Sequence, residues 1–403
     1  MNKVFRIICL SLLVFAVFFS ISCEKKSSEK LVVWVYDAGR IGALTDIGKK
    51  FQAEYKIPVE VSMVEITDIR TQFLLASGSS ECADLAILPH DNMGALIKDG
   101  AVAEMNIGAK RSAFLEPALE SFTFNGKLYG IPLAVENIGF FYNPDLTPVP
   151  PETWEDAVRM AQALKREGKI DYMFSCPDAT YHMYPLYDSF GGAIFGKNED
   201  GSLDGRKVII AEAGFVAGLE FLANNVRNGL IPETIDWDSA HVLFESGKAP
   251  FVLAGPWALD RIRTSGIPYR IGKFPGIRAG EPGNPFMGVQ GIFISSASPR
   301  RLLAQAFAEK YIANEDSMMA LFLADGRPSA WKAIFETLGD DDTLAFNAAG
   351  VNAIPMPSIP EMGYVWDAWA SAANLAFSGE RTPVAALENA KAQIESLSNN
   401  YND

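Results

Sequence analysis

The sequence predicts an α/β protein of two domains, and three observations support this fold class. The chain has 403 residues, which is too many for one hydrophobic core even after the apolar N-terminus is set aside. Short buried strands alternate with amphipathic helices, as in parallel sheets with right-handed crossovers. No long low-complexity linker separates two halves of the chain. We therefore expect the chain to pass between the two domains more than once.

The N-terminal segment has the features of an export signal. Two basic residues precede the apolar run IICLSLLVFAVFFSIS, and Cys23 follows this run directly. Such an order is typical of a secretory signal peptide, and a transmembrane anchor is the alternative. We expect residues 1–22 to be removed, Cys23 to carry lipid and residues 23–30 to act as a tether. Ser20 departs from the bacterial lipobox, in which leucine usually stands at this position.

The expected elements follow the alternation of strands and helices in order. Apolar residues recur at helical spacing in ALTDIGKKFQAEY, whereas KLVVWVY is a continuous apolar run typical of a buried strand. Thr153 and Asp156 form the pattern of a helix N-cap with its reciprocal acid. Strands are expected at residues 30–36, 58–64, 83–89, 249–254 and 291–296, and helices at 43–55, 68–78, 92–100, 154–168, 214–229 and 301–314.

Composition argues against several classes of partner. The formal net charge is −14, and no basic stripe is present that could neutralise phosphates, so we expect no nucleic acid. The three histidines, His90, His182 and His241, show no metal-ligand spacing, so we expect no metal and no cofactor. Cys82 and Cys176 are too few for a disulfide scaffold, and a single bridge between them is a minor alternative.

The sequence carries no motif of the common enzyme classes. There is no nucleophile elbow, no phosphate-binding loop and no dinucleotide fingerprint. Two carboxylates such as Glu136 and Asp91 could hydrolyse a glycosidic bond, but nothing in the sequence sets the distance between them. We expect that the protein is not an enzyme. Glu136 raises a separate question because it lies among apolar residues in GIPLAVENIGFF. Burying even a neutral polar group without a partner costs on the order of 2–7 kcal/mol.

Aromatic residues indicate the kind of ligand. Trp257 follows the strand expected at 249–254, at a carboxyl end where α/β proteins bind ligands. Flat rings beside hydrogen-bonding groups suit a sugar, whose C–H face stacks on the ring while its hydroxyls bond the polar groups. Trp366 and Trp369 differ by three and share a helix face, so at least one is expected in the core. Core packing is the alternative for each ring.

Four segments together resemble the maltose-binding-protein family, the extracellular sugar-binding components of ABC importers. They are residues 126–157, 247–262, 285–299 and 357–391, and the resemblance runs in order over about residues 30–397. It implies the two-lobed periplasmic-binding-protein fold of type II, with a ligand cleft between the lobes that closes by hinge bending. A ligand that touches both lobes only in the closed state shifts the population towards that state.

The resemblance also implies a set of ligand-binding residues. Glu136 matches an acid that hydrogen-bonds sugar hydroxyls, so its burial would be completed by a ligand in the closed cleft. The other implied residues are Tyr181 and Trp257 as an aromatic platform, Trp366 as a further stacking ring, Asp91 as a first-lobe acid, and Asp37 and Arg40 in the loop after the first strand. Leu88 and Asn92 stand where maltose binders have tryptophan and arginine, and Asn92 completes the set.

The expected lobe boundaries rest on the same resemblance. The first lobe comprises residues 31–134 and 291–326, the second lobe comprises 139–287 and 329–398, and hinge crossings lie at 135–138, 288–290 and 327–328.

The expected function is that of a binding protein for a maltose- or maltodextrin-like oligosaccharide. Such a protein is exported to the periplasm or the cell surface, held there by its lipid as a monomer, and delivers the sugar to the membrane permease of an ABC transporter. A binding protein for a polyamine or a peptide is the alternative. A glycoside hydrolase and a surface adhesin are more distant ones.

Overall fold

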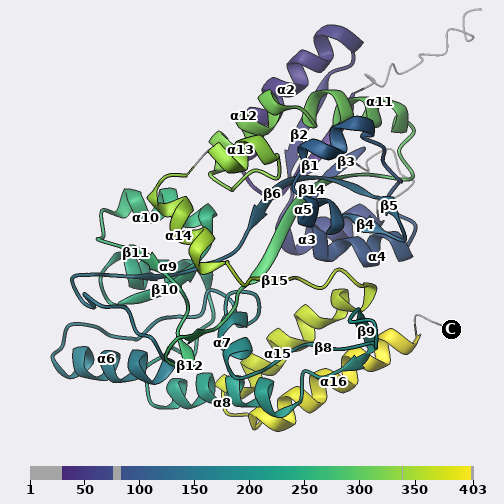
Figure 1. The fold of residues 1–403 in the computed structure, drawn as a ribbon. Helices are drawn as coiled ribbons and strands as arrows, with labels where there is room; N and C mark the ends of the chain where they lie inside the picture. The colour runs from purple at the N-terminus through teal and green to yellow at the C-terminus, as the bar shows by residue number, and fades with distance from the viewer. Residues whose placement is uncertain (1–29, 76–82, 338, 401–403) are drawn as a thin grey trace, which may run out of the picture.

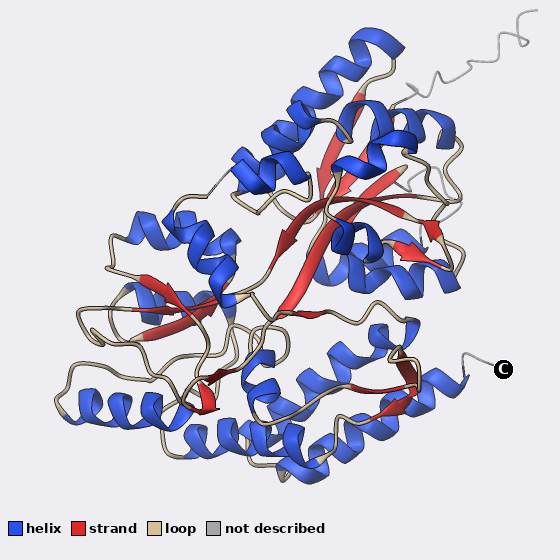
Figure 2. Cartoon of the chain, viewed as in Figure 1, coloured by secondary structure: helices blue, strands red, loops and turns tan. Residues whose placement is uncertain are grey.

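The computed structural model describes residues 30–75, 83–337 and 339–400. They form two lobes of mixed helix and strand, joined along the long strands β6 (Gly130–Glu136) and β14 (Phe286–Ile294) (Figures 1 and 2). The predicted two-lobed α/β fold is confirmed. The residues of the signal and lipidation predictions, 1–22 and Cys23, lie outside the described ranges, as does Cys82. Cys176 is buried and makes no disulfide with a described residue.

The first lobe is built on the larger sheet. Its strand order is β15-β14-β3-β1-β2, and β6 pairs with β14. β1 (Leu31–Val35) is parallel to β2 (Val59–Met63) and β3 (Leu85–Pro89), as predicted, whereas β14 runs antiparallel to β3 and β6. The remaining strands of this lobe are β4 (Thr123–Phe124) and β5 (Lys127–Leu128). The short strand β15 (Ile354–Pro355) pairs with the first residues of β14, and its Ile354 packs against the core of the second lobe.

Helices cover this sheet and fill its core. They are α2 (Gly39–Tyr55), α3 (Ile66–Leu75), α4 (Met93–Lys98), α5 (Glu116–Glu120), α11 (Arg301–Ala306), α12 (Glu315–Asp325) and α13 (Lys332–Thr337), with short turns η1 (His90–Asn92), η2 (Gly108–Ala113) and η4 (Phe307–Ile312). Leu44, Ile47 and Phe51 of α2 are buried at helical spacing in this core, as the sequence pattern predicts.

The second lobe has a smaller sheet, and its strands are antiparallel, whereas the sequence pattern predicts a parallel sheet. β7 (Gly139–Tyr142) pairs antiparallel with both β10 (Phe251–Ala254) and β11 (Arg270–Gly272). Continuous apolar runs such as FVLA fit any strand buried on both faces, so composition alone could not distinguish an antiparallel pair from a parallel one. The other strands are β8 (Phe195–Lys197), β9 (Leu203–Val208), β12 (Gly276–Arg278) and β13 (Glu281–Pro282).

Helices make up most of the second lobe. They are α6 (Trp154–Arg166), α7 (Tyr184–Ser189), α8 (Ala213–Arg227), α9 (Trp237–Glu245), α10 (Leu259–Ser265), α14 (Asp341–Ala349), α15 (Val365–Phe377) and α16 (Pro383–Asn400), with turns η3 (Pro256–Ala258) and η5 (Pro360–Tyr364). The predicted cap of α6 is present: the Thr153 hydroxyl accepts from the Asp156 amide at 3.1 Å, and the Asp156 carboxylate accepts from the Thr153 amide at 3.2 Å.

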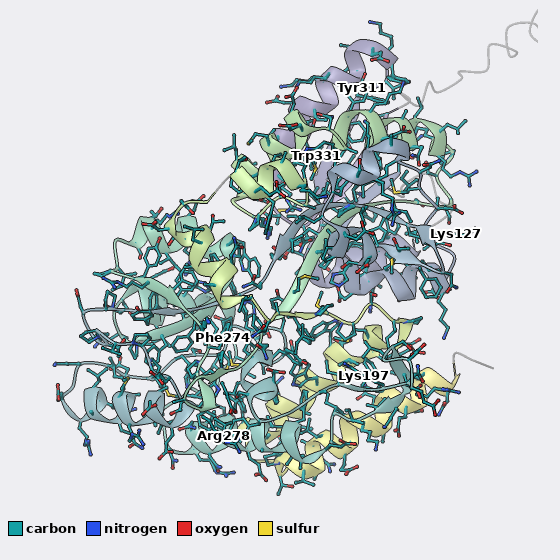
Figure 3. All side chains as sticks on the ribbon, viewed as in Figure 1. Lys127, Lys197, Phe274, Arg278, Tyr311 and Trp331 are labelled. Carbon is teal, nitrogen blue, oxygen red and sulfur yellow. The ribbon has the colours of Figure 1, made fainter. Side chains whose placement is uncertain are left out.

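The last passage between the lobes lies later than expected. Ala330, Trp331 and Ile334 pack in the core of the first lobe, and Figure 3 shows Trp331 there. Phe346 of α14 instead joins a core cluster of the second lobe, beside β7 and β10. The boundary predicted at 327–328 is therefore too early, because the pairing of Ala330 with Leu133 continues the first lobe beyond it. The chain changes lobe between α13 and α14.

Candidate ligand-binding site between the lobes

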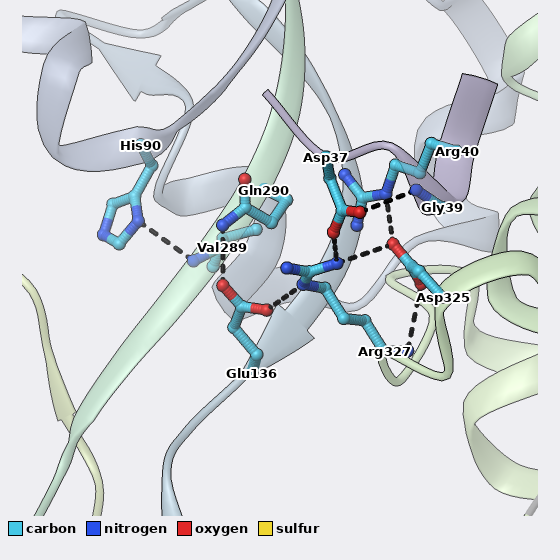
Figure 4. Close-up of polar contacts among 9 residues, drawn as sticks. All are labelled: Asp37, Gly39, Arg40, His90, Glu136, Val289, Gln290, Asp325 and Arg327. Atoms are coloured by element: carbon cyan, nitrogen blue, oxygen red, sulfur yellow. Dashed lines mark hydrogen bonds and ion pairs between the residues drawn. The ribbon is translucent and has the colours of Figure 1, made fainter. Parts of the chain in front are cut away.

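Glu136 ends β6, and its burial is met within the protein. The residue is 5% exposed. The amide of Gln290 on β14 donates to one carboxylate oxygen at 2.6 Å, and Nε of Arg327 donates to the other at 2.6 Å (Figure 4). Both oxygens thus have protein partners. The burial of Glu136 therefore does not require a ligand, because a buried guanidinium supplies the charge and a donor.

Arg327 is the centre of this polar network. Besides Glu136 it donates through Nη1 to Asp325 at 2.9 Å and to Asp37. Its guanidinium carbon lies 5.4 Å from the ring centroid of Trp257, in a cation–π arrangement. Burial on its own would lower the pKa of Arg327, but Glu136 and the other acidic groups around it outweigh burial and hold the pKa above its ordinary value. The group stays charged.

The predicted pair Asp37 and Arg40 does not act as a pair. Asp37 accepts from the amide of Gly39 at 2.9 Å and from Arg327. Arg40 is 2% exposed and bonds Asp325 instead. Burial opposes ionisation of Asp37, but Arg327 and the bonds it makes leave the pKa of this carboxyl below its usual value. Asp37 thus reaches the space between the lobes, whereas Arg40 is a buried structural partner.

Sequence reasoning missed Arg327, Asp325 and Gln290. A signal was available, since DGRP places two opposite charges beside a glycine and a proline in a segment already expected to cross between lobes. Charged residues at such a crossing rarely become buried unless they are paired.

Tyr181 and Trp257 meet in the second lobe, as the resemblance implied. Their ring centroids are 6.3 Å apart, and His182 lies edge-on to Trp257 at 5.9 Å. The hydroxyl of Tyr181 is buried and finds no hydrogen-bond partner among the described residues. Burial, and then the charge of Glu136, raise the pKa of Tyr181 well above its ordinary value. Tyr181 therefore carries a neutral phenol.

Asp91, Asn92 and Trp366 form a second group, and it joins the two lobes directly. Asp91 and Asn92 lie in η1 of the first lobe, and Trp366 lies on α15 of the second. The indole N–H of Trp366 donates to Asp91 at 2.9 Å, and the Asn92 amide donates to the same carboxylate at 3.0 Å. Burial raises the pKa of Asp91 to about 6 in spite of these bonds. Trp369, one turn further on, is fully buried, so one of the two tryptophans is core as expected.

His90 ties the same group to β14. The amide of Val289 donates to Nδ1 at 3.1 Å (Figure 4). Nε2 therefore carries the proton and donates to the carbonyl of Met356 at 3.0 Å. This arrangement requires a neutral imidazole. Burial lowers the pKa of His90 to about 4, in agreement with that tautomer.

A cavity of ≈ 290 Å³ opens between the lobes beside Trp257. We call it the Trp257 cavity; its lining residues are Tyr36, Asp37, Ala38, Gly39, Trp257, Asp260, Ala324 and Asp325. Trp257 and Asp260 belong to the second lobe and the others to the first. Of the predicted residues, Asp37 and Trp257 line the cavity, whereas Asp91, Asn92 and Trp366 contact one another elsewhere. No group of three potential ligands for a metal is found among the described residues.

Two lobes with a polar and aromatic cavity between them define a ligand-binding protein of the bilobal α/β class. The family model described as "bacterial extracellular solute-binding protein" matches residues 46–345, and the chain belongs to this family. Its members bind solutes outside the cell and are not enzymes, so these two predictions are confirmed. None of the helices in the described ranges is long and apolar enough to cross a membrane.

Curated relatives match nearly the whole chain. The galactooligosaccharide-binding protein of Bacillus subtilis (strain 168) is 28% identical over 93% of this chain and 92% of its own length. A maltooligosaccharide ABC transporter solute-binding lipoprotein of Streptococcus pneumoniae (strain ATCC BAA-255 / R6) is 24% identical over 92% of this chain and 90% of its own. The maltotriose-binding protein of Pyrococcus abyssi is 23% identical over 84% and 75%.

Proposed function

We propose that this protein captures a neutral oligosaccharide in the Trp257 cavity and delivers it to the permease of an ABC transporter. The observation that carries the proposal is that residues of both lobes line the cavity around one indole ring. A ring provides a face for the C–H surface of a sugar, and carboxylates and hydroxyls bond its hydroxyl groups. Two relatives are named as galactooligosaccharide- and maltooligosaccharide-binding proteins, and these names support this class of ligand.

Capture proceeds by hinge closure in this proposal. In this proposal the chain crosses between the lobes near residues 135–138 and 288–290 and again between α13 and α14. A ligand that contacts the first-lobe wall of the cavity and stacks on Trp257 of the other lobe gains both contacts only when the lobes are close, so it shifts the population to the closed form. The permease then recognises that form.

The exported protein remains attached to the membrane by its N-terminus. Cleavage before Cys23 and acylation of its thiol hold the chain through residues 23–30, and the lobes act as a monomer. A relative of S. pneumoniae is named a lipoprotein. Mass spectrometry of the membrane fraction, in which a Cys23→Ser variant loses the lipid mass, tests this step.

Calorimetric titration of the soluble form that begins at residue 24 tests the function. The titrants are maltotriose, a galactotriose, a β-linked glucose disaccharide and putrescine. We expect saturable binding of at least one oligosaccharide and none of putrescine. Binding of putrescine with no response to any sugar would overturn the carbohydrate function and favour a polyamine-binding protein, because the cavity also contains three carboxylates.

A further inference from the structure

We propose that Tyr36 and Asp260 determine the specificity of the Trp257 cavity, binding ligand hydroxyls from opposite lobes while the sugar ring contacts Trp257. This inference rests on the proposed function and names two contact residues that neither the sequence motifs nor the resemblance indicates. Tyr36 directly follows β1 in the first lobe, and Asp260 lies in the first turn of α10 in the second. Both line the cavity.

Tyr36 offers a hydroxyl that the protein does not use. Its ring packs against the core of the first lobe, which fixes its orientation, and the structure records no hydrogen bond from its hydroxyl to a described residue. Burial raises the pKa of Tyr36 far above neutrality, although Arg327 opposes the shift. The neutral phenol can both donate to and accept from a sugar hydroxyl.

Asp260 is the carboxylate of the cavity that is available to a ligand. Asp37 is held by Gly39 and Arg327, and Asp325 is held by Arg40 and Arg327. Asp260 is exposed to solvent, and the structure records no ion pair or hydrogen bond for its side chain with a described residue. Charge-assisted bonds to a free carboxylate are stronger than bonds between neutral groups, so Asp260 gives the cavity its strongest unused acceptor.

The charges around the cavity also select against an anionic sugar. Arg327 and Arg40 both form ion pairs with acids beside the cavity: Arg40 with Asp325, and Arg327 with Asp37, Asp325 and Glu136. Asp260 adds a negative charge and forms no ion pair with a described residue. A uronic acid would place its carboxylate against like charge, whereas a neutral oligosaccharide presents only hydroxyls.

Arg327 keeps Trp257 in place for this contact. Its guanidinium covers part of the indole at 5.4 Å, and a Cβ at Gly255 would lie 2.2 Å from the same ring. The indole is therefore held between a cation and close backbone. A ligand meets the part of Trp257 that lines the cavity together with Tyr36 and Asp260.

The test compares Tyr36→Phe and Asp260→Asn with two matched controls outside the cavity, Tyr129→Phe and Asp367→Asn. Each is titrated with maltotriose and the galactotriose, and with a trigalacturonate, using the soluble form that begins at residue 24. We expect Kd for the neutral sugar to rise about tenfold in each cavity variant, the usual effect of one lost hydrogen bond to a ligand. The controls should bind as wild type does, with unchanged thermal midpoints in all four variants.

Asp260→Asn should in addition lower the ratio of the Kd for the trigalacturonate to the Kd for the neutral trisaccharide. A merely structural role of Asp260 would not change this ratio. Unchanged sugar affinity in both cavity variants, with wild-type binding intact, would overturn this inference alone. Failure of the wild-type protein to bind any neutral sugar would overturn the proposed function and this inference with it.

Discussion

The two interlobe regions use similar residues in different ways. At the Trp257 cavity, Asp37 and Trp257 face a common space, and Arg327 binds the acids behind it. At the second region, the Asp91–Trp366 contact, an acid and an indole bond each other directly at 2.9 Å. Both pairs were expected to hold a ligand. The difference teaches that an acid and an indole on opposite lobes need not line a common cavity, because at the second region they bond each other directly.

The largest expected effect is the loss of folding stability when Arg327, the cation that pairs with the acids behind the cavity, is replaced. Arg327→Met removes the cation between Glu136, Asp37 and Asp325, and leaves the buried carboxylate of Glu136 without a cation. Breaking a buried ion pair in this way costs about 3–5 kcal/mol of folding free energy. Urea denaturation of the ligand-free protein measures the loss.

The matched control is Arg278→Met, whose side chain is 78% exposed and pairs at the surface with Glu281. It should change the free energy of unfolding little, because exposed pairs contribute about 0–1 kcal/mol. Equal effects of the two substitutions would contradict the buried network.

A pH profile sharpens the account of the second region. The folded-state pKa of Asp91 is raised to about 6, so below pH 6 the folded state binds more protons there than the unfolded state does, and stability falls as pH rises. The pKa of the adjacent His90 is lowered to about 4, so the unfolded state binds more protons there, and stability rises with pH up to its unfolded pKa. The two slopes oppose each other in the wild-type protein.

Asp91→Asn should therefore steepen the rise of stability between pH 4 and pH 6, by about 1–3 kcal/mol over that range. Thermal midpoints measured in steps of pH for both proteins give the comparison. Parallel profiles would show that Asp91 titrates normally.

A smaller effect is expected at the indole that meets Asp91. Trp366→Phe keeps a ring on α15 but removes the N–H donor, leaving Asp91 with Asn92. We expect the protein to lose about 1–2 kcal/mol of stability at pH 7.5, where the carboxylate is charged. Trp34→Phe, at another half-buried tryptophan that packs against Phe73, controls for the loss of indole area. A similar loss in both variants would assign the effect to packing rather than to the bond.

Local signals in the sequence predicted much of the fold. The cap of α6 depends on residues three apart, and the core face of α2 depends on a repeat within one helix, so both can be read from the chain. The position of Trp257 also follows from a strand and a turn pair beside it. Strand direction in the second lobe depends instead on which distant strands pair, and no local pattern specifies that.

The site was less accessible to sequence reasoning for the same reason. The bond from Arg327 to Glu136 joins residues 191 apart, and the bond from Trp366 to Asp91 joins residues 275 apart. A motif indicates a residue type and its place near a crossing between the lobes. It does not indicate whether a side chain distant in the sequence already forms a hydrogen bond or an ion pair with that residue. The sequence motif therefore identified Glu136 but not its distant partner Arg327.

The measurement that tests the central claim most directly is a paired titration of Trp257→Ala and Trp366→Ala with the oligosaccharide that the wild-type protein binds. If the ligand occupies the Trp257 cavity, Trp257→Ala weakens binding by about 1–3 kcal/mol, the effect of losing a buried aromatic contact, and Trp366→Ala weakens it much less. The reverse order, with Trp257→Ala binding as tightly as wild type, would contradict the account and place the ligand at the Asp91–Trp366 contact.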